Sequence, residues 1–196
     1  MKHLATVALM LNLGVAGVYA QQKPVNMTFS GTSAASTINL QYPGTNNSED
    51  NSAGNGTLGP FTFRNVRAIN ALPQPSSTCS GSTFPSGGKN DPVGYFLSVA
   101  GAAVFRFQDG SLLKVTLMQA GDCIDFAVLE AHCTMTFQIT GGTGRFKNAK
   151  GNLTLTETSL PVLFDASHNP VFFASTGEFT GTVSGVAAEE EGQDRR

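Results

Sequence analysis

The sequence predicts an all-β fold of about eight short antiparallel strands, closed into a barrel or packed as a sandwich. Three observations support this prediction. The chain of 196 residues contains 22 glycines, 20 threonines and 16 serines but only 13% charged residues, a composition typical of strands joined by many turns. Apolar and polar residues alternate in several evenly spaced segments with hairpin signals between them. No segment shows a convincing amphipathic helical period.

Composition also limits the size and the class of the protein. A chain of 196 residues suffices for one domain with a sizeable core. The low content of charged residues argues against a coiled coil and against a charge-driven disordered protein. The formal net charge of −2 gives no support to nucleic-acid binding, which normally shows a concentrated basic patch.

Residues 1–20 are typical of a secretory signal peptide. Lys2 and His3 form a short basic region, and residues 4–13 form an apolar region interrupted by Asn12. Val18 and Ala20 supply small residues at positions −3 and −1 of the expected cleavage after Ala20. We therefore expect a secreted or periplasmic protein with one β domain over residues 21–188 and a disordered tail over 189–196. No later segment reaches the roughly 18 apolar residues of a membrane-spanning helix, so we expect no membrane span in the mature chain.

The expected strands follow the alternating segments. They cover residues 25–30, 61–66, 103–107, 112–118, 124–129, 132–140, 153–156 and 171–183, with a weak strand over 37–42. Asp109-Gly110 predicts a hairpin turn because both residues tolerate positive φ. Residues 43–57 and 70–92 are expected to be loops, since Asn, Ser, Gly and Pro dominate them.

The three cysteines leave room for one disulfide and one free thiol in an exported protein. Cys133 shares a strand face with the apolar residues at 135, 137 and 139, which predicts a thiol in the core. Cys79 lies in the 70–92 loop and Cys123 follows a predicted turn, so we expect a Cys79–Cys123 disulfide. No C-x-x-C occurs, and His132 beside Cys133 lacks the convergent ligands of a zinc site, so no metal is expected.

Residues 140–146 (Thr-Gly-Gly-Thr-Gly-Arg-Phe) look like the Gly-rich turn that places pyrophosphate at a helix N-terminus in dinucleotide-binding proteins. Three features oppose this interpretation. Lys147 replaces the final glycine of the pattern, the following residues alternate like a strand, and no βαβ unit surrounds the turn. We therefore expect no nucleotide and no other cofactor.

The same turn supports a different relationship. Residues 142–151 (Gly-Thr-Gly-Arg-Phe-Lys-Asn-Ala-Lys-Gly) resemble the G-G-T-G-x-F-x-x-A-x-G turn of the allene oxide cyclase and dirigent protein families. Residues 54–63 (Gly-Asn-Gly-Thr-Leu-Gly-Pro-Phe-Thr-Phe) are similar to the strand-entry pattern of small exported bacterial proteins of this type. The resemblance implies a single eight-stranded antiparallel β-barrel with a central cavity over residues 21–188. Dirigent proteins commonly carry an arginine linked to catalysis after the motif's alanine; this sequence has Lys150, which lacks arginine's planar hydrogen bonding.

The candidate catalytic residues are Lys150, Asp125, Glu130 and His132, with Asp122 close in sequence. Carboxylates and an imidazole can perform acid–base chemistry if they converge in a cavity. Glu130 and His132 share a strand face opposite to that of Cys133. That face is solvated if the Cys133 face packs the core, and the two faces exchange roles if the barrel encloses a polar interior.

The chain has 14 phenylalanines and no tryptophan. The phenylalanines either fill the core or line an apolar ligand cavity. The candidate ligand-binding residues are Phe105, Phe107, Phe137 and Phe172. N-x-[ST] sequons occur at Asn26, Asn46, Asn55 and Asn152, and they matter only in a eukaryotic secretory pathway.

The expected function is that of an exported, non-catalytic β-barrel domain, whose ligand would be a small apolar molecule. The alternative is a dirigent-like or cyclase-like protein that constrains a reactive intermediate in its cavity, with Lys150 and nearby carboxylates assisting. A third hypothesis is an interaction module that uses the loops at 43–57 and 70–92. An open interior lined by phenylalanines and at least two ionisable groups would favour the alternative, whereas a solidly packed interior would favour the other two.

Overall fold

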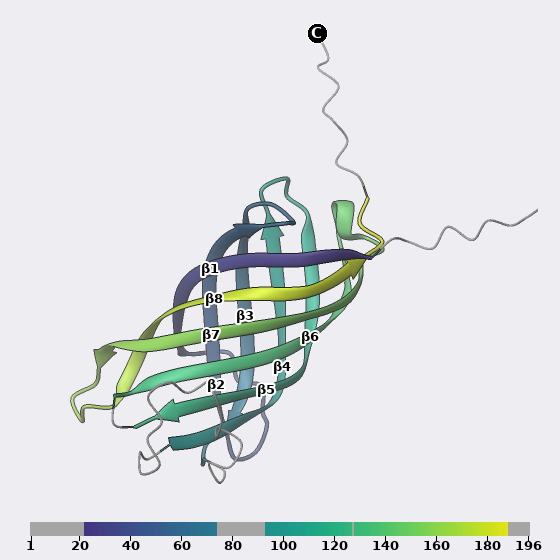
Figure 1. The fold of residues 1–196 in the computed structure, drawn as a ribbon. Helices are drawn as coiled ribbons and strands as arrows, with labels where there is room; N and C mark the ends of the chain where they lie inside the picture. The colour runs from purple at the N-terminus through teal and green to yellow at the C-terminus, as the bar shows by residue number, and fades with distance from the viewer. Residues whose placement is uncertain (1–21, 74–92, 127, 188–196) are drawn as a thin grey trace, which may run out of the picture.

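The computed structural model describes residues 22–73, 93–126 and 128–187, which form a closed antiparallel barrel (Figure 1). The strands are β1 (Lys23–Ala35), β2 (Thr45–Gly56), β3 (Phe61–Asn70), β4 (Val93–Phe107), β5 (Leu112–Asp125), β6 (Glu130–Gly142), β7 (Lys150–Phe164) and β8 (Pro170–Ser184). Each strand pairs with the next, and β1 pairs with β8 to close the sheet. The predicted eight-stranded antiparallel barrel is confirmed.

Three predicted features lie outside the described residues. They are the signal peptide over 1–20, the tail over 189–196 and most of the 70–92 loop, including Cys79. They stay predictions.

The prediction of a weak strand over 37–42 followed by a loop over 43–57 is wrong. Residues 45–56 form β2, which pairs with β1 and β3. The inward positions of β2 are polar or small, so apolar alternation is absent. At Gly54 a Cβ would lie 2.8 Å from the Phe61 ring and closer still to a backbone oxygen. Glycine is therefore required there because the backbone oxygen of Thr28 and the Phe61 ring fill the space that a side chain would occupy.

The predicted break between residues 118 and 124 is also wrong. β5 runs without interruption from Leu112 to Asp125, with a register shift between Leu117 and Gln119. Cys123 therefore lies in a strand and pairs with His132. Gly121 suits this strand because the Tyr95 ring occupies the place of a Cβ, and residues 126, 128 and 129 adopt turn conformations before β6 instead.

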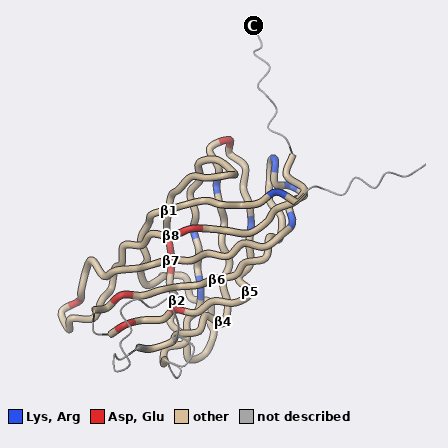
Figure 2. Tube along the Cα trace, viewed as in Figure 1, with Lys and Arg blue, Asp and Glu red and all other residues tan. Residues whose placement is uncertain are grey.

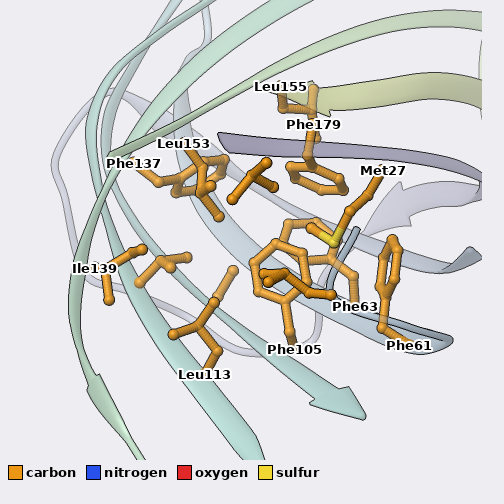
Figure 3. Packing of buried hydrophobic residues seen from close by; sticks show 14 of the residues in the cluster. Met27, Phe61, Phe63, Phe105, Leu113, Phe137, Ile139, Leu153, Leu155 and Phe179 are labelled. Atoms are coloured by element: carbon orange, nitrogen blue, oxygen red, sulfur yellow. The ribbon is translucent and has the colours of Figure 1, made fainter. Parts of the chain in front are cut away.

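One half of the barrel interior is packed with apolar side chains (Figure 3). Phe105, Phe137 and Phe179 have no solvent exposure. Their rings lie in one mutually packed group, in which the Phe63–Phe105 centroids are 4.7 Å apart and the Phe105–Phe179 centroids 4.9 Å apart. Aromatic pairs at such distances stabilise the fold beyond the area that they bury. These rings contact each other, and the interior at this level is filled by side chains.

The turn between β6 and β7 contains the short 3-10 segment η2 (Gly144–Phe146) and closes this apolar half. Arg145 connects this turn to the β2–β3 turn and to the β4–β5 turn. Its guanidinium lies 5.0 Å and 4.7 Å from the ring centroids of Phe107 and Phe146, donates to the carbonyl of Leu58, and forms an ion pair with Asp109 at 3.1 Å. The buried Phe146 ring and the Arg145 contacts explain why the Gly-Arg-Phe sequence forms a rigid turn.

Replacing Arg145 with methionine is expected to lower the free energy of unfolding by about 1–2 kcal/mol, because it removes the cation–π contacts and a charge-assisted hydrogen bond while keeping the apolar stem. Urea unfolding followed by circular dichroism measures this loss. The matched control is Lys147→Met in the same turn, where the side chain is exposed and no loss is expected. Equal stability of the two variants would contradict the assigned role of Arg145.

Candidate functional site

The other half of the barrel interior is polar. Seven strands each direct at least one buried polar or thiol side chain inward here, and we call this set the polar layer. Its members are Asp50, Asn65, Arg67, Ser98, Asp122, Cys133, Glu157, Ser159 and Ser175. The strand register places these residues at similar positions along the barrel axis. Asp50 pairs with Asn65 on the neighbouring strand, and Cys133 pairs with Asp122 on one side and with Glu157 on the other.

Strand period explains why these polar side chains point inward. Asn65 and Arg67 continue the face of β3 that begins with Phe61 and Phe63. Glu157 continues the face of Leu155 on β7 in the same way. Because side chains alternate with period two, polar residues at these positions enter the barrel.

Arg67 is the centre of the charged network. Its Nη1 donates to both carboxylate oxygens of Asp122, at 2.7 and 2.6 Å, and to Ser98 Oγ at 3.3 Å. Its Nε lies 3.5 Å from Asp50 Oδ2, and both arginine and aspartate side chains are almost fully buried. Burial opposes the charge, but the carboxylates of Asp122 and Asp50 hold the pKa of Arg67 well above its usual value. The guanidinium therefore stays charged inside the barrel.

Two buried acceptors in this layer have no hydrogen-bond partner among the described residues. Asn65 Nδ2 donates to Asp50 Oδ2 at 2.7 Å, which leaves Asp50 Oδ1 and Asn65 Oδ1 without a donor. Asp50 is 4% exposed and Asn65 is fully buried. An unsatisfied buried acceptor costs about 1–3 kcal/mol, so this arrangement favours a molecule that brings hydrogen-bond donors.

Glu157 is poised to exchange a proton near neutral pH. Burial and the negative charge of Asp50 raise its pKa to about 7, although Arg67 and hydrogen bonds from Ser159 and Ser175 oppose this shift. Ser159 Oγ donates to Glu157 Oε1 at 2.8 Å. A carboxyl group with this pKa can act as either acid or base at neutral pH.

The thiol of Cys133 is held in its neutral form. Burial and the carboxylates of Asp122 and Glu157 raise the pKa of its thiol well above the usual value. Because the thiolate is the reactive form of cysteine, we treat the neutral Cys133 thiol as part of the inner surface of the barrel.

The polar layer is about as closed to solvent as the apolar half. Arg67, Asp122 and Glu157 are 4%, 5% and 6% exposed, and Phe61 and Phe29 in the apolar half are 4% and 7% exposed.

The candidate catalytic residues from the sequence do not converge. Glu130 and His132 lie on the outer face of β6, where Glu130 Oε1 and His132 Nε2 are 2.6 Å apart and Thr158 Oγ1 is 3.3 Å from His132 Nδ1. Asp125 is buried at the last position of β5. Lys150 is exposed at the other end of the barrel, as the first residue of β7. Only Asp122, next to these candidates in the sequence, belongs to the polar layer.

The candidate ligand-binding phenylalanines are also divided. Phe105, Phe107 and Phe137 lie in the packed apolar core, and Phe172 is 36% exposed on β8. The prediction that Cys133 faces the core is confirmed, and Cys133 is a free buried thiol. The Cys79–Cys123 disulfide stays a prediction because Cys79 lies outside the described residues.

Sequence reasoning missed Asp50, Asn65, Arg67 and Glu157. A sequence signal exists for Asn65, Arg67 and Glu157. Each is a polar or charged residue at an inward-facing position of a strand whose other inward-facing residues include Phe or Leu. Asp50 has no such signal, because the composition of residues 43–57 predicts a loop.

Within the described parts of the chain, no group of three His, Cys, Asp or Glu side chains is placed to hold a metal ion. No helix in these parts is long and apolar enough to cross a membrane. The asparagines of all four sequons are exposed. Comparison with protein-family models and with curated proteins finds no match to this sequence.

Proposed function

We propose that this is an exported β-barrel binding protein whose polar layer holds a small polar molecule that donates hydrogen bonds. The unpaired oxygens of Asp50 and Asn65 carry this proposal, because they are buried acceptors on two side chains that contact each other across β2 and β3. A donor group of the ligand would satisfy both.

Charge favours a cationic ligand. The layer contains one guanidinium, from Arg67, against the carboxyl groups of Asp50, Asp122 and Glu157. A buried charge is costly unless it is paired, so an ammonium or amidinium group would offset the excess negative charge. The packed rings of the apolar half support a polar ligand rather than the apolar one that the sequence suggested.

Thermal unfolding in the presence of ethylammonium tests this proposal. Ethylammonium is expected to raise the unfolding temperature by mass action, and acetate at equal ionic strength is not. Asp50→Asn removes the charge and is expected to abolish the shift, while Glu130→Gln on the outer face preserves it. An equal shift with both salts, or one that survives Asp50→Asn, would refute the site.

A second candidate function is favoured by Glu157. A carboxyl with a pKa of about 7 suits proton transfer to and from a reactive molecule that the barrel constrains, as in the dirigent-like or cyclase-like alternative. Dihydroxyacetone in D₂O is a probe: the Glu157 carboxylate would take its α-proton, exchange that proton with D₂O, and return a deuteron to the carbon. Deuterium incorporation that disappears in Glu157→Gln supports this function, and incorporation at the buffer rate opposes it.

A further inference from the structure

The η2 end of the barrel is rich in basic residues (Figure 2). The described basic residues there are Lys23, Arg106, Lys114, Arg145, Lys147 and Lys150. Asp109, in the β4–β5 turn, also lies at this end and is paired with Arg145. Several acidic residues, among them Asp122, Asp125, Glu130 and Asp165, lie toward the opposite end.

A groove of about 1050 Å³ lies on the outer surface of the basic end. Its polar side chains come from β6, from the β6–β7 turn and from the start of β7, and the backbone of residues 184–187 forms another wall. The polar side chains are Gln138, Thr140, Lys147, Asn148, Lys150 and Asn152.

Local structure fixes these side chains along the groove. Gln138 pairs with Asn152 across β6 and β7, and Lys150 pairs with Ser184 of β8. Gly185 has φ +71°, and a Cβ there would lie 2.2 Å from the carbonyl oxygen of Asn148. The chain after β8 therefore passes tightly against the turn, which is anchored by the buried Phe146 ring.

The groove has positive charge without a counter-charge from the described residues. Lys147 and Lys150 are exposed, and neither takes part in the ion pairs found in the described parts of the chain. No carboxylate is among the described residues that line the groove. An anionic ligand would meet two lysines that no acidic side chain neutralises.

We propose that this groove binds an acidic oligosaccharide, a chain of sugars that carry carboxylate groups. The lysines would pair with the carboxylates, and the side-chain amides of Asn148, Asn152 and Gln138 would exchange hydrogen bonds with sugar hydroxyls. The volume of about 1050 Å³ is just above the roughly 300–1,000 Å³ that ligand pockets commonly span, so the groove has room for an extended ligand of several sugar units. No aromatic ring lines the groove among the described residues, which disfavours single-stranded nucleic acid because its bases bind by stacking on aromatic side chains.

Calorimetric titration with tetragalacturonate tests the proposal. The protein used should lack a glycan at Asn152, checked by mass, because a glycan there would occupy the groove. Saturable binding is expected at low salt, with affinity falling about tenfold or more in 0.5 M NaCl because salt screens exposed charges. The neutral maltotetraose is expected not to bind.

Paired variants locate the site. Lys147→Gln combined with Lys150→Gln is expected to weaken tetragalacturonate binding at least tenfold. The control Lys114→Gln removes the same kind of charge at the same end of the barrel from a side chain that does not line the groove, and is expected to change affinity less than twofold. Circular dichroism confirms folding of each variant.

Three results would overturn the proposal. They are absence of binding at low salt, an equal loss in the control variant, and equally tight binding of oligothymidylate or of anionic phosphatidylglycerol vesicles, which would indicate unspecific attraction of anions. The groove and the polar layer are independent sites. Asp50→Asn is therefore expected to leave tetragalacturonate binding unchanged, and either proposal can fail without the other.

Discussion

Replacing Arg67 with methionine is expected to lower the free energy of unfolding by about 3–5 kcal/mol, because removing one partner of a buried ion pair leaves the other charge uncompensated. Here two carboxylates lose their partner. Asp122 accepts two short hydrogen bonds from Arg67, and Asp50 lies 3.5 Å from its Nε. Urea unfolding at pH 7 followed by circular dichroism measures the loss.

The control comes from the same strand. Arg64 pairs with Glu49 of β2 at 2.9 Å, but its side chain is 60% exposed. Exposed ion pairs contribute only about 0–1 kcal/mol, so Arg64→Met is expected to have a small effect that high salt reduces further. Similar small losses in both variants would show that water solvates the polar layer freely and would remove the basis for a desolvated site.

Glu157→Gln is expected to change the pH dependence of stability by about 3 kcal/mol. The pKa of Glu157 is about 7 in the folded protein against a normal value of 4.5, and each unit of difference corresponds to about 1.4 kcal/mol. The folded state favours the protonated carboxyl. Its stabilising contribution is therefore fully present below about pH 4.5 and is lost as the pH rises through about 7.

The measurement is urea unfolding of the wild type and of Glu157→Gln at several pH values between 4.5 and 8.5. The stability of the wild type relative to the variant is expected to fall across this range, because glutamine does not titrate. Glu130→Gln is the control, since Glu130 lies on the outer face of β6. Parallel curves for wild type and Glu157→Gln would mean that Glu157 is solvated.

The residues of β6 and β2 show how far the sequence could predict this fold. β6 follows the simple rule, since Cys133, Met135 and Phe137 face the core and the residues between them face outward. β2 breaks the rule because its inward positions include Asp50, Ser52 and Gly54. The absence of apolar alternation in β2 has two causes, the polar layer at Asp50 and the lack of space for a side chain at Gly54, and a search for apolar faces detects neither.

The candidate site was hidden for the same reason. Asp122 and Asp125 are close to each other in the sequence, so their proximity can be predicted without the structure. The polar layer, in contrast, is assembled across the barrel from residues such as Arg67 and Glu157 that are far apart in the chain. Only closure of the sheet brings them together. Spacing along the sequence therefore predicts which ionisable residues of β5 and β6 are neighbours. The buried charged network of the polar layer depends instead on the register between strands.

Closure of the barrel also has a consequence for how the protein folds. The β1–β8 ladder joins residues from nearly opposite ends of the described chain, such as Met27 and Phe179. Contacts of such large sequence separation form slowly, so the aromatic core stays incomplete until this last ladder is made. Once formed, no strand has a free edge from which unfolding can begin. We therefore expect slow folding and amide hydrogen exchange in which all eight strands open as one cooperative unit.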